Sequence, residues 1–400
     1  SSDRNLVLKT DGYVDLGSPS EITYDDTTDM TLSFDWNFSN MQGSTSLREL
    51  NVLRPNGRGS LNIDHLSFST EIHADDTRTY VKSIRYAHGN DFSVDFVRAA
   101  NNQYTMTIKI EGQEPNRPQG RPRVYMKPQK SYGFSDEALR YYTNTQYLSD
   151  LVLLFEQQLR QLHYLGPLRD YPKRIYKYGG EQPMDVGLRG DDAINALIAS
   201  KTQGLRPYPG RGRQVSVEER VAQWLVELGL AHSFETRPLV KGRSEYEVRI
   251  RRHEQSPEVV ITDLGIGVSQ ILPVLVLCYY VPEGSTIILE QPELHLHPSV
   301  QSGLADVFID VIQKRNVQII LESHSEHLLR RLQRRIAEEK ITPDKTTLYF
   351  CDLQNGASTI QSLKIDMFGQ ISNWPADFFG DMSGDVAATL DAGFERQLSK

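Results

Sequence analysis

The sequence predicts an α/β protein: an N-terminal lobe of antiparallel β-strands, then a C-terminal lobe with a mostly parallel sheet covered by helices. Two observations lead to this fold class. The first 130 residues contain short runs in which apolar and polar residues alternate, and from residue 245 strand-length apolar runs alternate with helical patterns. The composition agrees, because 38% hydrophobic and 24% charged residues are typical of a folded globular chain.

The domain organisation follows from the length and from these changes of pattern. Four hundred residues are more than one ordinary domain holds. We expect a β-rich N-terminal lobe at 1–130, a helical region at 131–244, the C-terminal lobe at 245–352 and an extension at 353–400.

Charge and cysteine content exclude several classes of protein. The net charge of −8 argues against a generally basic nucleic-acid binder, and two cysteines do not make a disulfide framework. The longest apolar run, 271–281, is much shorter than the roughly 20 residues that span a bilayer. The chain opens without a signal-peptide pattern. We therefore expect a cytoplasmic protein without membrane contact.

The N-terminal lobe shows strand patterns in order along the chain. Residues 6–17 form two short runs around Asp11-Gly12, which predicts a hairpin. Residues 30–38 and 104–110 alternate cleanly, so each is expected to be a strand with one apolar face. The proline-rich stretch 111–130 indicates a loop or lobe boundary.

Helical patterns follow. One long helix is expected from a cap at Ser135 to about residue 162, and another begins at Ser216, which has Glu219 at capping-box spacing. The remaining elements alternate as strand and helix: strands 245–250 and 258–262, a helix from about 269, strand 285–290, a helix from 299, strand 316–322, helix 325–338 and strand 346–351.

Two of these strands end in functional groups. The first delivers Glu290, Gln291 and Glu293, and the second delivers Glu322, Ser323 and His324. Each end alone is equally well explained by first-turn acids and helix caps. Both together, at the edge of an α/β sheet where ligands bind, favour a nucleotide site in which an acid holds Mg²⁺ and a polar group contacts a phosphate.

A glycine turn lies upstream, in residues 261–273. Gly265 and Gly267 precede Ser269 and Gln270 at the start of an apolar helix. Such a turn exposes backbone N–H groups that suit a phosphate, although alone it is more often a tight strand-to-helix connection.

The order and spacing of these motifs resemble the ABC-type, AAA-like ATPase heads of the SMC, RecF and OLD group, which includes prokaryotic anti-phage ATPases. The resemblance is carried by "EQPELHLHP" (290–298) as a Walker B strand end and by "ESHSEHLL" (322–329). It also rests on "YLGPLRDYP" (164–172) and on "GQISNWPADFFGD" (369–381), which is similar to a C-terminal extension found in the group. It covers roughly residues 160–390, and the N-terminal strands more loosely.

The resemblance implies a role for each site residue. Glu290 takes the position of the Mg²⁺-coordinating acid, Gln291 that of the usual catalytic glutamate, and His324 that of the switch histidine facing the γ-phosphate of ATP. An amide orients water but accepts no proton, so either Glu293 serves instead or hydrolysis is slow. The signature loop that contacts nucleotide would be formed by Gly265, Gly267, Ser269 and Gln270, without the usual serine beside the first glycine.

Partners and cofactors are implied in the same way. We expect ATP and Mg²⁺ as cofactors, a homodimer or larger homo-oligomer in which 294–298 cross the interface, and an effector protein such as a nuclease or toxin. Anti-phage defence or DNA maintenance is the implied role, with DNA as a candidate ligand. A phosphate-binding loop of the form G-x-x-x-x-G-K-S/T does not occur in the sequence. We therefore expect this segment to be missing from the chain or supplied by another one.

Two other functions stay open. The chain could be a hydrolysis-deficient, nucleotide-gated scaffold or interaction subunit. It could also be a metal-dependent nuclease or hydrolase that uses a cluster of histidines and glutamates: His295, His297, His324, His327, Glu290, Glu293 and Glu322.

Two basic stretches are candidate DNA contacts. Helix 328–340 carries four arginines, although a solvated helix face explains them better. Segment 169–178 interleaves basic residues with tyrosines, which suits contact with phosphates and stacking on bases. The alternative is a loop that joins two lobes, in which Arg169 binds nucleotide or a carboxylate.

Overall fold

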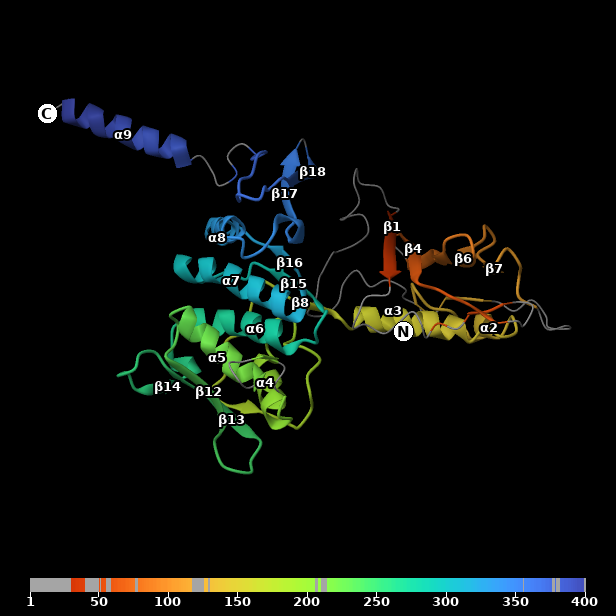
Figure 1. Ribbon diagram of the computed structural model, residues 1–400, viewed down its shortest axis with the longest axis horizontal. Helices are drawn as coiled ribbons and strands as arrows, with labels where there is room; N and C mark the ends of the chain where they lie inside the picture. Colours follow the sequence, from red (N-terminus) through yellow and green to blue (C-terminus); the bar gives the residue numbers. More distant parts are fainter. Residues whose placement is uncertain are drawn as a thin grey trace. The chain divides into compact units, whose positions relative to one another are not determined.

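The computed structural model (Figure 1) divides into two compact units, Ser1–Leu162 and His163–Lys400, which are described separately below. The predicted hairpin at 6–17 lies outside the described residues. The four-part division expected from the sequence stays a prediction. The structure describes residues 30–39, 50, 52–54, 59–75, 78–116, 126–128, 130–205, 208–209, 214–354, 356–375, 378 and 382–398.

The first unit is built on a five-stranded antiparallel sheet of order β1-β4-β5-β6-β7. Its strands are β1 (Met30–Ser39), β4 (His65–Asp75), β5 (Arg78–His88), β6 (Phe92–Arg98) and β7 (Tyr104–Ile110); β2 (Val52–Leu53) and β3 (Ser60–Leu61) pair separately. The strands predicted at 30–38 and 104–110 are confirmed. In β7 the alternation buries Met106, Ile108 and Ile110 on one face.

Two helices, α2 (Asp136–Leu139) and α3 (Tyr147–Leu159), contribute to the core of this unit. The α3 side chain of Phe155 packs on Phe68 of the sheet with ring centroids 4.5 Å apart. The prediction of one long helix from Ser135 was wrong, although Ser135 does cap α2. The helix is interrupted because Asn144 has a left-handed φ of 58° and the Thr145 hydroxyl donates to the Leu139 carbonyl.

The second unit contains an antiparallel sheet formed by β9 (Tyr176–Lys177), β12 (Ser233–Pro238), β13 (Glu245–Arg251) and β14 (Glu258–Val260), and a separate pair, β10 (Tyr208–Pro209) with β11 (Gln214–Val215). Helices α4 (Ala193–Thr202) and α5 (Val217–Glu227) belong to the same unit. The predicted capping box is confirmed: the Glu219 amide donates to the Ser216 hydroxyl over 3.1 Å, and the Ser216 amide donates to the Glu219 carboxylate over 2.9 Å.

A three-stranded sheet of order β16-β15-β8 positions the predicted strand ends. Its strands are β8 (Leu162–Leu165), β15 (Thr286–Glu290) and β16 (Gln318–Glu322), and β15 and β16 run parallel. The connecting helices are α6 (Ile266–Tyr280), α7 (Pro298–Arg315) and α8 (Glu326–Ala337). Helix α6 begins three residues before its predicted start and lies between α5 and α7 (Figure 1), where it is buried from Val268 to Tyr279.

A polar network joins α5, α6 and α7. Arg220 of α5 lies 3.0 Å from the Asp310 carboxylate of α7, which also accepts a hydrogen bond from the Tyr279 hydroxyl of α6 over 2.9 Å. Burial raises the pKa of Asp310, but hydrogen bonds from Lys314 and Arg220 outweigh it and hold that pKa below its ordinary value. The network fixes the helix that begins directly after the loop of β15.

The last predicted strand, 346–351, does not belong to the parallel sheet as expected. Strand β17 (Leu348–Gln354) pairs with β18 (Ala357–Leu363) in an antiparallel hairpin of its own and does not extend the parallel sheet. Its side chains are exposed or half-buried, unlike those of a strand covered by helices on both faces. Helix α9 (Met382–Leu398) follows. The predicted α/β class, with antiparallel sheets and a parallel one, is confirmed. None of the helices in the described ranges has the length and apolar character needed to cross a membrane.

Candidate functional site

The carboxyl ends of β15 and β16 meet side by side. Both strands are short runs of isoleucine and leucine that end in glutamate, and their parallel register pairs Glu290 with Glu322. The hydrogen bonding between the two strands continues one residue beyond β15, because the Gln291 amide donates to the Glu322 carbonyl over 3.0 Å. The sequence prediction that these two strand ends lie together is confirmed.

Arg169 fixes the path of the chain at this edge. Arg169 is buried, with only 5% of its surface exposed. One terminal nitrogen donates to the carbonyls of Gln291 and Pro167 over 2.9 and 3.1 Å, and the other donates to the Glu290 carbonyl over 3.1 Å. Burial lowers the pKa of Arg169 to about 10, although the nearby Glu293 and Tyr164 oppose this shift. Arg169 therefore binds backbone carbonyls and is not presented to solvent.

Tyr164 of β8 orients the carboxylate of Glu290. The pKa of Tyr164 is raised by burial first, then by the charge of Glu290 and by a hydrogen-bonding interaction with its carboxylate. Sequence reasoning missed this residue. The only signal was its place in the stretch 164–172, because a tyrosine in a short strand has no distinctive pattern.

In the loop that follows β15, two residues have backbone angles that non-glycine residues rarely adopt. Gln291 has a φ of 43° and His295 a φ of 62°, both in the left-handed region. Such conformations cluster at functional sites, where surrounding contacts hold them. Here the contacts are the hydrogen bonds that Gln291 makes to Arg169 and to Glu322.

Glu293 connects the two loops that follow the strands. Its side chain is buried at 7% exposure, and its Oε1 accepts a hydrogen bond from the His324 backbone amide over 2.8 Å. The other carboxylate oxygen, Oε2, is buried without a hydrogen-bond partner among the described residues. Glu293 thus holds the backbone of His324 in place relative to the β15 loop.

His324 itself points outward. Its side chain is 79% exposed, with Nε2 lying 3.2 Å from the Glu322 carboxylate. The next residue, Ser325, caps α8 and donates to the Gln301 side chain of α7 over 2.7 Å. The histidine ring therefore lies at the surface, while its backbone is held by Glu293.

The glycine turn lies beside the β15 loop. A Cβ placed on Gly267 would be 3.9 Å from the His295 carbonyl oxygen, so the two segments adjoin. Gly265 and Ile266 are exposed. Ser269 and Gln270 are buried, and the Ser269 hydroxyl donates to the Ile266 carbonyl over 2.7 Å. The turn thus presents its first residues outward and its serine and glutamine inward.

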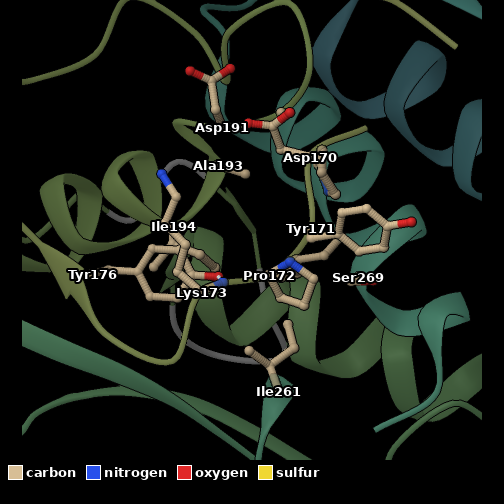
Figure 2. A pocket seen from close by; sticks show the side chains of 13 residues that line it. Asp170, Tyr171, Pro172, Lys173, Tyr176, Asp191, Ala193, Ile194, Ile261 and Ser269 are labelled. Carbon is tan, nitrogen blue, oxygen red and sulfur yellow. Dashed lines mark hydrogen bonds between the residues drawn. The ribbon is translucent and has the colours of Figure 1, made fainter. Parts of the chain in front are cut away.

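Ser269 borders a shallow hollow formed with segment 169–178 (Figure 2). Asp170 and Asp191 lie on one side of the hollow and Ile261 on the opposite side. Asp170 is paired with Arg189 over 2.9 Å. In the same segment Arg174 pairs with Asp263 over 2.6 Å, so Arg174, like the buried Arg169, already has a protein partner.

The arginines of α8 are also paired with acids. Arg331 and Arg335 bond Asp306 of α7 over 2.7 and 2.6 Å, while Arg330 and Arg334 bond Glu326 and Glu338 of the α8 segment over 3.1 and 2.6 Å. This geometry favours an ion-paired helix face over a free basic patch for DNA.

The histidine–glutamate metal centre does not assemble. Of the residues that the structure describes, Asp64, His65 and His88 form the one group of three or more metal-binding side chains close enough to share an ion. His297 instead caps α7 and bonds Ser299. The alternative of a metal-dependent nuclease therefore has no geometric support at the strand ends.

An α/β fold with acids at the ends of neighbouring parallel strands is the arrangement of a nucleotide-binding ATPase domain. Residues 67–330, more than half of the chain, match the family model described as "AAA domain, putative AbiEii toxin, Type IV TA system". The chain belongs to this AAA domain family. The ATPase-head resemblance expected from the sequence is confirmed. Residues 341–388 match "Protein of unknown function (DUF3696)".

Comparison with solved structures gives SMC heads at low scores. An SMC head domain from Thermotoga maritima is 9% identical, with 75% of each chain covered and a TM-score of 0.31. An SmcHead bound to the C-winged helix domain of ScpA is 8% identical, with 74% of each chain covered and a TM-score of 0.34. A third, an Smc head bound to the C-terminal domain of ScpA derived from Pyrococcus furiosus, is 8% identical, with 74% of this chain and 77% of that chain covered and a TM-score of 0.31. None of the curated proteins matches the chain.

Proposed function

We propose that the chain is an ATPase head that binds Mg²⁺-ATP at the ends of β15 and β16, dimerises around the nucleotide and controls a partner effector. The observation that supports this most directly is the in-register pair Glu290 and Glu322, with Arg169 and Tyr164 holding Glu290 in place. Carboxylate oxygens are the ligands that Mg²⁺ prefers, so the residues present fit this ion. When bound, Mg²⁺ would neutralise charge on the phosphates of ATP.

Each side chain of the site has a distinct task in this proposal. Glu290 holds the metal and Tyr164 orients its carboxylate. Gln291, fixed on both sides of its backbone, orients water without accepting a proton, so turnover is slow. His324 reaches the γ-phosphate from a backbone position held by Glu293. The G-x-x-x-x-G-K-S/T pattern of a phosphate-cradling loop does not occur in the printed sequence.

The proposed dimer face is the glycine turn with the β15 loop. Gly267 lies beside His295, and both Ile266 (42% exposed) and His295 are accessible. A second copy would place its nucleotide against Gly265 and Gly267, whose outward backbone suits a phosphate. The effector, a nuclease or toxin, and a role in anti-phage defence rest on the sequence resemblance. A nucleotide-gated scaffold with little turnover is the second candidate, favoured by Gln291.

Light scattering of the intact protein tests dimerisation. We expect Mg²⁺-ATP to double the mass relative to ADP. Ile266→Glu should prevent the doubling because it places a charge in the proposed interface. The matched control is Val240→Glu at another exposed apolar residue (53% exposed), and it should dimerise normally. A mass that is the same with ATP and ADP would contradict the proposed dimer.

A pair of substitutions at Glu293 separates positioning from proton transfer. Glu293→Gln keeps an oxygen for the His324 amide, so we expect ATP turnover per folded molecule to stay within about threefold of wild type. Glu293→Ala removes that oxygen, and turnover should fall by about tenfold or more as His324 loses its anchor. If glutamine is as damaging as alanine while the protein stays folded, Glu293 is the proton acceptor and not a positioning residue.

A further inference from the structure

A cluster of metal-binding side chains lies in the first unit, on residues that have no role in the proposed nucleotide site. His65 is the first residue of β4 and Asp64 precedes it, while His88 is the last residue of β5, the neighbouring antiparallel strand. Asp64 Oδ1 lies 2.7 Å from His65 Nδ1 and 3.8 Å from His88 Nδ1. The two imidazole rings have centroids 4.3 Å apart.

The donor set suits a transition metal. Each of the three residues offers a ligand atom, and these atoms lie within 4.8 Å of one another. Zinc is bound by imidazole nitrogen and carboxylate oxygen at about 2.0–2.2 Å, so donors a few ångströms apart reach a common ion with small side-chain rotations. The strand pairing brings the two histidines together although 23 positions separate them, as the hydrogen bond from His88 to the His65 carbonyl shows.

His88 is already held as metal-ligating histidines are. Its side chain is only 12% exposed, and Nδ1 lies 2.7 Å from the His65 carbonyl oxygen. A carbonyl only accepts, so Nδ1 donates in this bond, and in the neutral ring Nε2 carries the lone pair. Such a bond from one ring nitrogen to a backbone carbonyl fixes the tautomer and orientation of a ligand imidazole. The side chains of Asp64 (67% exposed) and His65 (59% exposed) leave the opposite side open to solvent, so an ion can enter.

We propose that Asp64, His65 and His88 bind one divalent transition-metal ion of the zinc type, with water at its remaining positions. The ion ties the start of β4 to the end of β5 and is separate from the magnesium proposed for ATP. It selects borderline-soft cations over Mg²⁺, because two of its three ligands are imidazole nitrogens.

Calorimetric titration of Zn²⁺ into the intact, chelator-treated protein tests this site. We expect one saturable site, with affinity lowered about tenfold or more in His65→Ala, in His88→Ala and in Asp64→Asn. The matched control is His253→Ala, which removes one exposed histidine of the second unit and should bind zinc as wild type does. Zn²⁺ should also raise the unfolding temperature of wild type and of the control, but not of the His88 variant.

Three results would overturn the proposal. One is the absence of saturable zinc binding in the wild type at free Zn²⁺ concentrations up to about 1 mM, which is the Kd of a weak site. Another is equal affinity in the wild type and in both histidine variants, which would place the zinc elsewhere. The third is unchanged affinity in Asp64→Asn, which would reduce the site to a histidine pair. Circular dichroism spectra confirm that each variant is folded before titration.

Discussion

Arg169→Ala is expected to destabilise the unit from His163 to Lys400 by about 3 kcal/mol or more. The change removes three hydrogen bonds from a charged donor to the carbonyls of Pro167, Glu290 and Gln291. It also removes the positive charge that interacts with the buried carboxylate of Glu293. Urea unfolding of the intact protein measures the change. Arg169→Lys should be intermediate, since one ammonium does not span the carbonyls that a guanidinium reaches.

The matched control is Arg174→Ala, five positions along the same segment. Arg174 is exposed (65%) and makes an ion pair with the exposed Asp263. Its loss should cost less than about 1 kcal/mol. If the two alanine variants unfold at the same urea concentration, the contacts of Arg169 do not hold the end of β15, and our account of the site's rigidity fails.

The largest functional effect is expected at Glu290. Glu290→Gln keeps the shape and the hydrogen bond to Tyr164 but removes the charge that the metal needs. We expect Mg²⁺-dependent ATP turnover to fall by about 100-fold or more, because metal stabilisation of the reacting phosphates contributes several kcal/mol. A coupled phosphate-release assay on the intact protein measures it.

Glu283→Gln is the control for this change. Glu283 is an exposed acid in the turn just before β15, so its loss should leave turnover unchanged. Turnover in Glu290→Gln that equals the control would remove Glu290 from the metal site and would point to Glu322 as the acid.

The sequence was sufficient to predict which residues lie at the ends of β15 and β16, but not which residues contact those strand ends. A run such as "TIILEQ" carries its own strand pattern and its own chemistry, so the meeting of Glu290 and Glu322 follows from strand order alone. Arg169 lies more than 120 positions from the carbonyls of Glu290 and Gln291 that it binds, and no local sequence pattern predicts such a contact. Tyr164 was missed for the same reason.

The direction in which individual side chains point was also not predictable from the sequence. Helical periodicity shows that α6 is apolar, but it does not tell which of its first residues face outward, and Ser269 proved to be turned inward. The break between α2 and α3 depends on a side-chain hydrogen bond of Thr145, which competes with the helix in a way that average propensity hides. A strand forms near the predicted position 346–351, but this strand, β17, pairs with β18 and not with the parallel sheet.

The central claim is that the ends of β15 and β16 bind ATP through Mg²⁺, and calorimetric titration of ATP into the intact protein tests it most directly. We predict saturable binding with Mg²⁺ that weakens by about tenfold or more when EDTA replaces the metal or when Glu290 is replaced by glutamine. Binding of equal strength in all three conditions, or no binding by the wild type with Mg²⁺, would contradict the assignment of this site.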